Sequence, residues 1–360
     1  MSTICLNMIV KDEAPVIRRC LGSVKPFIDA WVIVDTGSSD GTQDLIRQEL
    51  AGIPGELHER PWVDFATNRT AAIRLAGRRC DYLYVIDADE ELQLPEGWRR
   101  PVLEAEAYSL RYRYQNLAYD RISLVKADLP WRYEGVLHEY LECGRPVKAI
   151  PLDGPVVICR PEGARSRDPE KFVKDALLLE NALRKEPDNL RYRVYLAQSY
   201  RDAGDLEKAL ANYSARAAQG GWEEEVYVAR LNIARLKERL DAGPAEVARA
   251  YQEAHVCRPA RAEALVDLAR YHRLRGEHPL AYLYARAAAE LEPSADVLFV
   301  ETDASEWRAL DERAIAAYWV GRFAESLELC ERLLGEGVLP EGERVRVETN
   351  RQFAMNALGG

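Results

Sequence analysis

The chain has 360 residues, which is enough for two domains that each bury a core of their own. Its composition, 48% hydrophobic and 30% charged, is that of an ordinary globular protein, and its net charge of -10 argues against the basic face that nucleic-acid binding needs. No apolar run approaches the roughly 20 residues of a membrane span, and the N-terminus lacks the basic leader of a signal peptide. The 7 scattered cysteines contain no Cys-x-x-Cys pair, so we expect a cytoplasmic protein with reduced thiols and neither a zinc site nor disulfides.

Strands and helices alternate over the first part of the chain. The hydrophobic patterns predict, in order, a strand at 4–10, a helix at 13–24, a strand at 30–35, a helix at 42–50, a weaker strand at 56–60, a helix at 64–76 and a strand that begins at Tyr82. This alternation is typical of a mostly parallel sheet with right-handed crossovers, whose ligands bind beyond the carboxyl ends of the strands. Asp35 and Asp87 both lie at the carboxyl ends of such strands, so we expect both carboxylates to face one crevice.

The strand that begins at Tyr82 ends in a cluster of acid, with Asp87, Asp89, Glu90 and Glu91 in five positions. Four carboxylates repel one another unless a cation lies among them. Hard divalent ions such as Mg²⁺ or Mn²⁺ suit all-oxygen sites, and a diphosphate can complete the coordination shell. The alternative is a solvated acidic loop after a buried strand.

A second informative stretch, Asp35-Thr-Gly-Ser-Ser-Asp-Gly-Thr42, follows the strand at 30–35. A carboxylate at a strand end can accept a hydrogen bond from a base or a ribose, and small residues beside it allow a flat ring to approach the backbone. A plain turn followed by a helix N-cap would use the same residues. The stretch lacks the Gly-x-Gly-x-x-Gly spacing of dinucleotide-binding sites and the Gly-Lys-Ser/Thr of a P-loop.

Four motifs together resemble those of the family 2 glycosyltransferases with the GT-A fold. They are Met8-Ile-Val-Lys-Asp-Glu13, Val32-Ile-Val-Asp-Thr-Gly-Ser-Ser-Asp-Gly-Thr42, Asp64-Phe-Ala-Thr-Asn-Arg69 and Leu83-Tyr-Val-Ile-Asp-Ala-Asp-Glu90, in the order that the family has. The resemblance implies a Rossmann-like α/β domain and a nucleoside diphosphate sugar as donor, usually a uridine one such as a UDP-hexose or UDP-N-acetylhexosamine. It also implies an inverting hexosyl transfer that depends on Mn²⁺ or Mg²⁺.

The resemblance also assigns roles to single residues. Asp35 is expected to contact the base, Asp87 the ribose or the metal, and Arg69 the donor phosphate, although Thr70 stands where the family usually has Asn. Asp89, the second acid of the Asp-x-Asp motif, is expected to hold the metal against the diphosphate. The full set of donor-binding residues implied by the motifs is Val10, Lys11, Glu13, Asp35, Ser38, Arg69, Asp87 and Ala88.

Beyond residue 91 a strand-like alternation at 108–114 precedes a Gly-x-x-His-Glu pattern that ends at His138 and Glu139. Family members carry a similar pattern after Asp-x-Asp, so the resemblance makes His138 the third metal ligand, beside Asp87 and Asp89. A packed core histidine is the alternative. An inverting transfer needs a carboxylate near the acceptor proton, and we favour Glu139, which must then lie on a loop to point the same way as His138. Four other carboxylates stay open as the base, namely Glu134, Glu90, Glu91 and Asp128.

From about Glu162 the strands vanish and helices rich in Ala, Leu, Arg and Glu follow one another. Pro259 and Pro293 lie 34 positions apart (293 − 259 = 34), which is the tetratricopeptide period. We therefore predict a GT-A catalytic domain over residues 1–162 and an all-α tetratricopeptide-type repeat domain over residues 163–360. The repeats would stack with a concave face, and aromatic residues such as Tyr192 and Tyr195 are expected mostly in the core.

This combination resembles bacterial peptide S- or O-glycosyltransferases of the sublancin glycosyltransferase type, so we expect the repeats to hold a peptide or protein acceptor. One alternative is a non-catalytic repeat scaffold with a degenerate nucleotide-sugar-binding domain. Another is a haloacid-dehalogenase-like phosphatase, which would need Asp-x-Asp after its first strand, whereas three predicted strands precede the motif here. The oligomeric state is left open, with a homodimer as one alternative.

Overall fold

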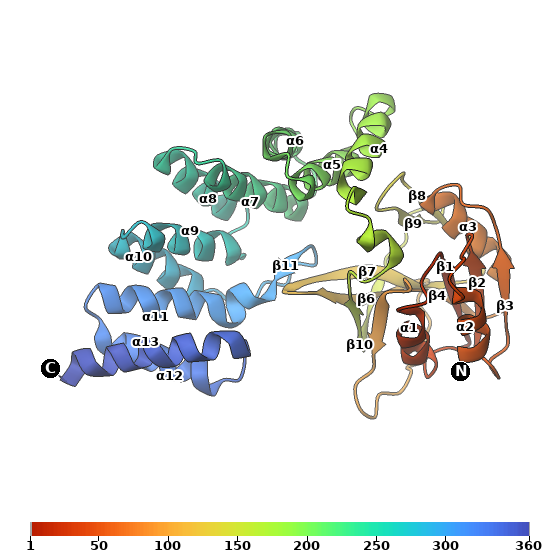
Figure 1. The fold of residues 1–360 in the computed structure, drawn as a ribbon, viewed down its shortest axis with the longest axis horizontal. Helices are drawn as coiled ribbons and strands as arrows, with labels where there is room; N and C mark the ends of the chain where they lie inside the picture. The colour runs from red at the N-terminus through yellow and green to blue at the C-terminus, as the bar shows by residue number, and fades with distance from the viewer. Residues whose placement is uncertain (1, 360) are drawn as a thin grey trace. The chain divides into compact units, whose positions relative to one another are not determined.

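The computed structural model describes residues 2–359, and the chain divides between Ala203 and Gly204 into two compact units. The first unit contains a twisted sheet with its helices and then two further helices, and the second is almost entirely helical (Figure 1). None of the helices in the described part of the chain has the length and apolar character that crossing a membrane requires.

The sheet of the first unit has the strand order β3-β2-β1-β4-β7-β6-β10-β5. Its strands are β1 (Ile4–Val10), β2 (Ala30–Asp35), β3 (Gly55–Glu59), β4 (Tyr82–Val85), β5 (Glu90–Gln93), β6 (Ala107–Tyr114), β7 (Leu117–Lys126) and β10 (Ile150–Cys159). Strands β3, β2, β1 and β4 pair in parallel, as β6 and β10 do, which confirms the mostly parallel sheet. The antiparallel pairings of β7 with β4 and β6, and of β5 with β10, were not expected.

Strand β1 is buried on both faces, because helices cover the sheet from both sides. Ile4, Leu6 and Met8 pack in one core cluster with helix α1 (Ile17–Val24). Cys5 packs in the other cluster with helix α3 (Phe65–Ala76). Helix α2 (Thr42–Glu49) follows β2. Because β1, β2 and β4 run parallel, their carboxyl ends meet at one edge, and the loops that carry the predicted donor-binding residues begin there.

Helices replace strands after β10, and each long helix packs against the next along the chain. Gly204 and Gly276 have φ of +87° and +73° and lie just after the first helix of a pair, where a left-handed residue commonly ends a helix. The helices are η1 (Ala164–Arg167), α4 (Lys171–Lys185), α5 (Leu190–Ala203), α6 (Leu206–Gln219), α7 (Glu223–Arg239), α8 (Pro244–Cys257), α9 (Glu263–Leu274), α10 (His278–Ala289), η2 (Ala304–Arg308), α11 (Ala309–Trp319), α12 (Phe323–Gly335) and α13 (Glu341–Gly359).

The change from strands to helices lies close to the predicted boundary at residue 162, but the compact units divide later. Helices α4 and α5 group with the sheet rather than with the rest of the helical region. The first helices of the predicted repeat domain are therefore near enough to the sheet to contact its loops.

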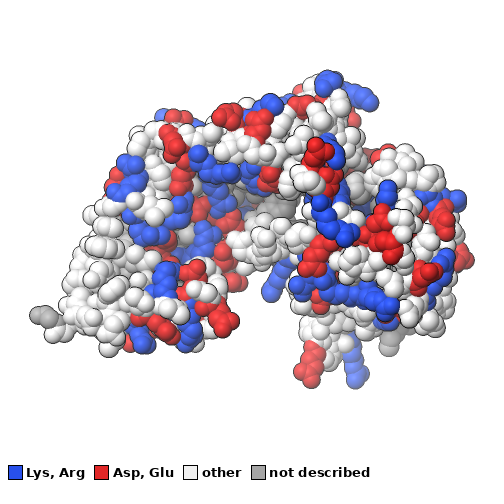
Figure 2. All heavy atoms as spheres, viewed as in Figure 1, with Lys and Arg blue, Asp and Glu red and all other residues white. Residues whose placement is uncertain are grey.

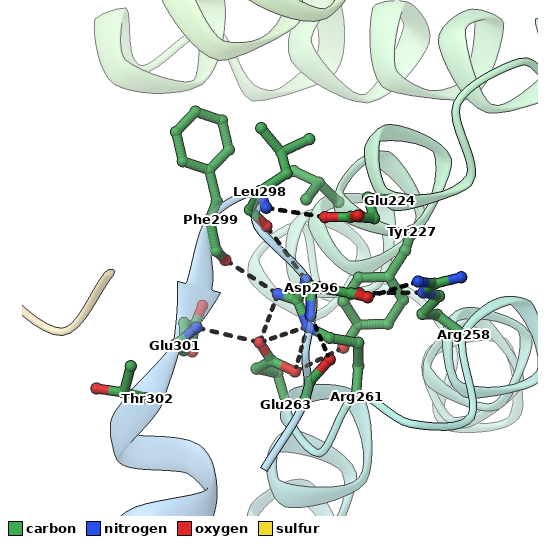
Figure 3. A network of polar contacts seen from close by, with 12 residues as sticks. Glu224, Tyr227, Arg258, Arg261, Glu263, Asp296, Leu298, Phe299, Glu301 and Thr302 are labelled. Carbon is green, nitrogen blue, oxygen red and sulfur yellow. Dashed lines mark hydrogen bonds and ion pairs between the residues drawn. The ribbon is translucent and has the colours of Figure 1, made fainter. Parts of the chain in front are cut away.

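One segment interrupts the regular helix pairs. Residues 290–303 connect α10 to the π-helical turn η2 and contain the two-residue strand β11 (Val300–Glu301). Arg261, which is fully buried, holds this segment by donating to Asp296 (3.4 Å) and to the backbone carbonyl oxygens of Leu298 (3.2 Å) and Phe299 (3.0 Å) (Figure 3). Glu263 in turn accepts from Arg261 at 2.6 Å, so no charge of this group lacks a partner. The 34-residue period gave no sign of this insertion.

Candidate active site

Asp35 ends β2 and is fully buried. Its Oδ1 accepts hydrogen bonds from the N–H groups of Gly37 (2.9 Å) and Ser38 (2.8 Å) and from Gln43 Nε2 (3.1 Å). Burial acts to raise the pKa of Asp35, but these hydrogen bonds outweigh it and hold the pKa below its ordinary value. Its Oδ2 is buried and has no hydrogen-bond partner among the described residues. A charged acceptor therefore stays available at the carboxyl edge of the sheet.

The loop after β1 lies against the turn that follows Asp35. Asp12, which has a φ of +54°, donates its N–H to Ser38 Oγ (2.9 Å), and Glu13 donates its N–H to Thr42 Oγ1 (2.9 Å). The carboxylate of Glu13 accepts from the N–H of Ala164 at 3.2 Å. Glu13 thus connects the Asp35 turn with the segment that follows β10, and this places its carboxylate at the same edge.

Three of the predicted donor-binding residues contribute no side-chain contact to this group. Val10 is buried at the end of β1, where its carbonyl oxygen accepts from the N–H of Thr36 at 2.9 Å. Ala88 is buried between the two acids of the Asp-x-Asp motif, and Lys11 is exposed.

Asp87 lies between two guanidinium groups. Arg69 Nη2 donates to its Oδ1 at 2.5 Å, and Arg121 Nη1 approaches its Oδ2 at 3.4 Å. Burial acts to raise the pKa of Asp87, but Arg69 and Arg121 outweigh it and bring the pKa to about 2. Arg121 also binds Glu90 at 2.8 Å, and Glu90 accepts the N–H of Asp87 at 2.9 Å. Asp87 is therefore ionised at neutral pH and is balanced by charges of the chain itself.

Among the described residues, no arginine or lysine side chain donates a hydrogen bond to Asp89 or Glu13. Asp89 Oδ2 accepts only the N–H of Gly163, at 3.2 Å, among the hydrogen bonds of the described residues. Burial and the charge of Asp87 raise the pKa of Asp89, while burial and the charge of Asp89 raise the pKa of Glu13 to about 7. Asp89 and Glu13 are half-buried, and carboxylates that raise one another's pKa are a fitting set of oxygen ligands for a divalent cation.

Glu139 lies in the loop between β8 (Arg132–Glu134) and β9 (Tyr140–Glu142), as its predicted role requires. Its Oε1 accepts from Arg69 Nε at 2.6 Å, so Arg69 joins Glu139 to Asp87. His138 precedes it with a φ of +51° and stacks on Tyr195, with ring centroids 3.9 Å apart.

The three predicted metal ligands are not gathered into one site. Over residues 2–359, no group of three or more His, Cys, Asp and Glu side chains is arranged to hold a metal ion. Asp87 is bound by two arginines, Asp89 faces Gly163, and the His138 ring lies against Tyr195. The metal site remains a prediction, and the described contacts fit Asp89 to it better than Asp87.

The other carboxylates considered as the base lie in different surroundings. Glu134 and Glu91 form ion pairs with Arg132 (2.8 Å) and Arg160 (3.1 Å), and Asp128 is exposed. Glu90 is buried, and burial raises its pKa to about 6 against the effect of Arg121. Glu139 is thus the one of these candidates for which a contact with Arg69 is seen.

Sequence reasoning missed several residues of the site. Arg121 reaches Asp87 because β7 pairs antiparallel with β4, and the spacing of the motifs does not predict that pairing. The N–H of Gly163 contacts Asp89 from 74 positions away, and the N–H of Ala164 contacts Glu13 from 151 positions away. Backbone groups make both contacts, so no side chain in the sequence indicates them.

The second unit contains a cavity of about 420 Å³ between α9, η2, α11 and α13. Its arginines are held by carboxylates, for example Arg273 by Glu312 (2.6 Å) and Arg346 by Asp311 (2.9 Å). Basic and acidic side chains are likewise interspersed over the second unit in Figure 2. The residues that line the cavity include Val266, Arg270, Arg273, Trp307, Ile315 and Arg346.

Comparison with known proteins relates both parts of the chain to described families. A family model for "Glycosyl transferase family 2" matches residues 5–105. The chain is 31% identical over 316 residues to TPR repeat-containing protein Synpcc7942_0270 of Synechococcus elongatus, with 81% of this chain and 76% of that protein covered.

Two relatives named as glycosyltransferases match over shorter lengths. The SPbeta prophage-derived glycosyltransferase SunS of Bacillus subtilis is 33% identical over 88 residues, 24% of this chain and 20% of SunS. The lipopolysaccharide core biosynthesis glycosyltransferase LpsC of Rhizobium meliloti is 31% identical over 159 residues, 38% of this chain and 56% of LpsC. The chain therefore spans about a fifth of SunS and about half of LpsC.

Proposed function

We propose that this chain, which belongs to the family 2 glycosyltransferases that carry tetratricopeptide repeats, transfers a hexosyl group from a UDP-sugar to a peptide or protein side chain. That it is a glycosyltransferase follows from the family. The donor, the metal, the inverting stereochemistry and the acceptor are the parts proposed here.

The observation that carries the donor assignment is the buried Oδ2 of Asp35, which has no partner among the described residues. A buried charged acceptor without a hydrogen bond is costly, at about 1–3 kcal/mol or more. The ring N–H of a uracil base would supply the missing donor. Gly37 and Gln43 keep Oδ1 occupied, so only Oδ2 is left to read the base.

Asp89 and Glu13 are proposed to hold a Mn²⁺ or Mg²⁺ ion with the donor diphosphate. His138, which the structure does not gather into one group with Asp89, stays a proposed further ligand on the ground of the resemblance alone. A bound cation of this kind would act as a Lewis acid that stabilises the departing diphosphate. Stacking on Tyr195 occupies the face of the His138 ring and leaves the nitrogens at its edge for a ligand. Arg69, which binds Asp87 and Glu139, is proposed to contact a donor phosphate.

Glu139 is proposed as the general base. The acceptor oxygen or sulfur would attack the anomeric carbon from the side opposite the diphosphate, the carbon–oxygen bond to the diphosphate would break, and the acceptor proton would pass to Glu139. Arg69 Nε donates to the Glu139 carboxylate at 2.6 Å, and this charge-assisted contact orients the carboxylate.

The acceptor is proposed to bind the helical region. The cavity of about 420 Å³ offers both apolar and charged side chains, which suits a peptide segment rather than a sugar alone. A second function is favoured by one observation: Arg69 and Arg121 already neutralise Asp87, as they would in a non-catalytic scaffold that keeps only nucleotide-sugar binding.

Nucleotide release from a panel of UDP- and GDP-sugars, with and without Mn²⁺, tests the proposal. We expect slow hydrolysis of one UDP-sugar that requires the metal and is lost in Asp89→Asn. A wild-type protein that binds a UDP-sugar but neither hydrolyses nor transfers it would favour the scaffold. No binding of any nucleotide sugar would contradict both functions.

A further inference from the structure

The loop that carries His138 and Glu139 has an unusual backbone. Gly135 has a φ of +110°, and a Cβ atom at this position would lie 3.4 Å from the Cα of Glu139, so the turn is tight. His138 has a φ of +51°, in the left-handed region that residues other than glycine seldom adopt. Such a conformation is strained and persists only where the surroundings hold it.

Helix α5 supplies these surroundings. Arg191 donates from Nε (3.0 Å) and Nη2 (2.6 Å) to the carbonyl oxygen of His138, so both arms of the guanidinium hold the strained residue. Tyr195, one turn further along α5, stacks on the His138 ring with an interplanar angle of 12°. The Arg191 guanidinium also lies over the rings of Tyr195 (5.0 Å) and Tyr140 (5.1 Å), which fixes its own position.

These contacts continue to the acidic edge of the sheet. His138 is covalently joined to Glu139, whose carboxylate binds Arg69, and Arg69 binds Asp87. A displacement of the His138 backbone therefore moves Glu139 and loosens the only guanidinium that touches both Glu139 and Asp87 among the described hydrogen bonds.

We propose that Arg191 and Tyr195 of α5 are positioning residues for the catalytic loop: they hold His138 in its left-handed conformation and so place Glu139 against Arg69. This proposal rests on the proposed function, in which Glu139 is the base. It gives the first helices of the repeat region a role in catalysis itself, in addition to any role in acceptor binding, and it assigns a function to a tyrosine that the repeat pattern would place in the core.

The test compares two arginines of the same helix. Arg191→Ala removes the bond to His138, whereas Arg193→Ala removes a similar bond to the carbonyl oxygen of Pro187, away from the loop. With UDP-sugar hydrolysis as the assay, we expect Arg191→Ala and Tyr195→Leu to lower kcat about 10–100-fold, the usual loss for residues that orient a functional group. The donor KM should change less than about 3-fold because the Asp35 turn is untouched, and Arg193→Ala should match the wild type.

Tyr195→Phe keeps the stacking ring, so we expect it to restore kcat to within about 2-fold of the wild type. Hydrogen exchange over residues 134–140 gives a readout without activity: exchange should speed up in Arg191→Ala and not in Arg193→Ala. If Tyr195→Leu does not fold, Arg191→Gln serves instead, because it keeps a donor but loses the two-armed contact and should also lower kcat.

The outcomes separate the two proposals. A wild-type enzyme that hydrolyses no donor contradicts the proposed function, whatever the variants do. An active wild type with equal kcat in Arg191→Ala and Arg193→Ala overturns the positioning role. If kcat falls equally in Tyr195→Phe and Tyr195→Leu, the stacking of Tyr195 on His138 is not the cause of the positioning effect. A rise in donor KM without a fall in kcat would also overturn it, because it would place α5 in donor binding instead.

Discussion

Arg69 is the residue on which the geometry of the candidate site depends most. Its Nε binds Glu139 at 2.6 Å and its Nη2 binds Asp87 at 2.5 Å, and its side chain is only 12% exposed. Buried ion pairs of this kind contribute more through the orientation they impose than through net stability. The two carboxylates were identified from sequence, as was Arg69, but the pairing of Arg69 with Glu139 requires the fold, because the two residues are 70 positions apart.

Glu139→Gln tests the base at the residue scale. Glutamine keeps an oxygen for the Arg69 bond but cannot take a proton, so we expect kcat for transfer to fall by about 100-fold or more while the donor KM changes little. Steady-state kinetics measures both constants. The matched control is Glu134→Gln in the preceding strand, whose carboxylate is half exposed and bound to Arg132. An active Glu139→Gln enzyme would rule out Glu139 as the base.

At the scale of elements, the turn η1 is the least expected part of the site. The residue before it, Gly163, has an ordinary φ of -63°, so glycine is needed there for space rather than for backbone conformation. A Cβ atom at this position would lie 2.8 Å from Asp89 Oδ2 and 3.4 Å from Glu13 Oε1.

Gly163→Ala should therefore displace the Asp89 carboxylate and lower kcat about 10-fold, since shifts of about 1 Å in a reacting group can cost up to 100-fold. Kinetics of UDP-sugar hydrolysis checks this. Gly22→Ala is the control, because no atom lies within 4 Å of the added Cβ in helix α1. If Gly163→Ala and Gly22→Ala have the same kcat, the contact between η1 and Asp89 has no part in the reaction.

The inserted segment of the second unit is held by Glu301, which binds Arg235 (2.6 Å) and Arg308 (2.9 Å). Burial acts to raise the pKa of Glu301, but the two arginines outweigh it and lower the pKa to about 2, against 4.5 for a free glutamate. The Glu301 carboxylate therefore binds a proton less tightly in the folded state than in the unfolded state. The stabilisation, about 3 kcal/mol, is complete above pH 4.5 and is lost as the pH falls from 4.5 toward 2.

We expect Glu301→Gln to have a lower unfolding temperature than the wild type at pH 7. The difference between the two unfolding temperatures should become smaller between pH 4.5 and pH 3. Thermal unfolding monitored by circular dichroism across pH gives both values. Glu306→Gln, at an exposed position of the π-helical turn, is the control and should follow the wild type. A gap that stays constant down to pH 3 would contradict the pKa assignment.

Elements with local signals could be predicted from sequence, and the contacts between them could not. The alternation of strands and helices up to Tyr82 has strong hydrophobic periodicity, and the structure confirms it. The helix expected from residue 13 begins at Ile17, because a turn at Glu13 precedes it, in which Glu13 O accepts from Val16 N and Ile17 N. The antiparallel strands after Asp-x-Asp and the insertion at 290–303 depend on pairings between distant residues, which periodicity does not encode.

At the scale of the whole molecule, the chain separates donor chemistry from the proposed acceptor binding. The motifs proposed to bind the donor lie in the first unit, and the cavity of about 420 Å³ lies in the second. The length of the chain allowed two domains, and the repeat spacing predicted helix pairs. Neither could show that α4 and α5 would group with the sheet or that α5 would contact His138, because these contacts join residues far apart in the sequence.

Trp307→Ala should weaken the binding of a peptide acceptor and leave the binding of the donor unchanged. Trp307 lines the cavity, so its truncation should raise the KM for a peptide acceptor about 10-fold, a typical loss for an aromatic residue at the centre of an interface. A library of Cys- and Ser-containing peptides supplies the acceptor, and UDP-sugar hydrolysis without peptide supplies the comparison. Trp319→Ala, at an exposed residue outside the cavity, is the control. An unchanged peptide KM in Trp307→Ala would exclude the cavity as the acceptor site.

The most direct measurement is the binding of UDP in the presence of Mn²⁺ by isothermal titration calorimetry, with wild type, Asp35→Asn and Asp44→Asn. Asparagine at position 35 can keep the Oδ1 contacts but turns the free buried acceptor into a donor, so we expect UDP affinity to fall about 10-fold or more. Asp44→Asn, on α2 at a side chain that is 89% exposed, should leave the UDP affinity unchanged. Equal UDP affinity in wild type and Asp35→Asn, or no UDP binding by the wild type, would contradict a uridine nucleotide site at the carboxyl edge of this sheet.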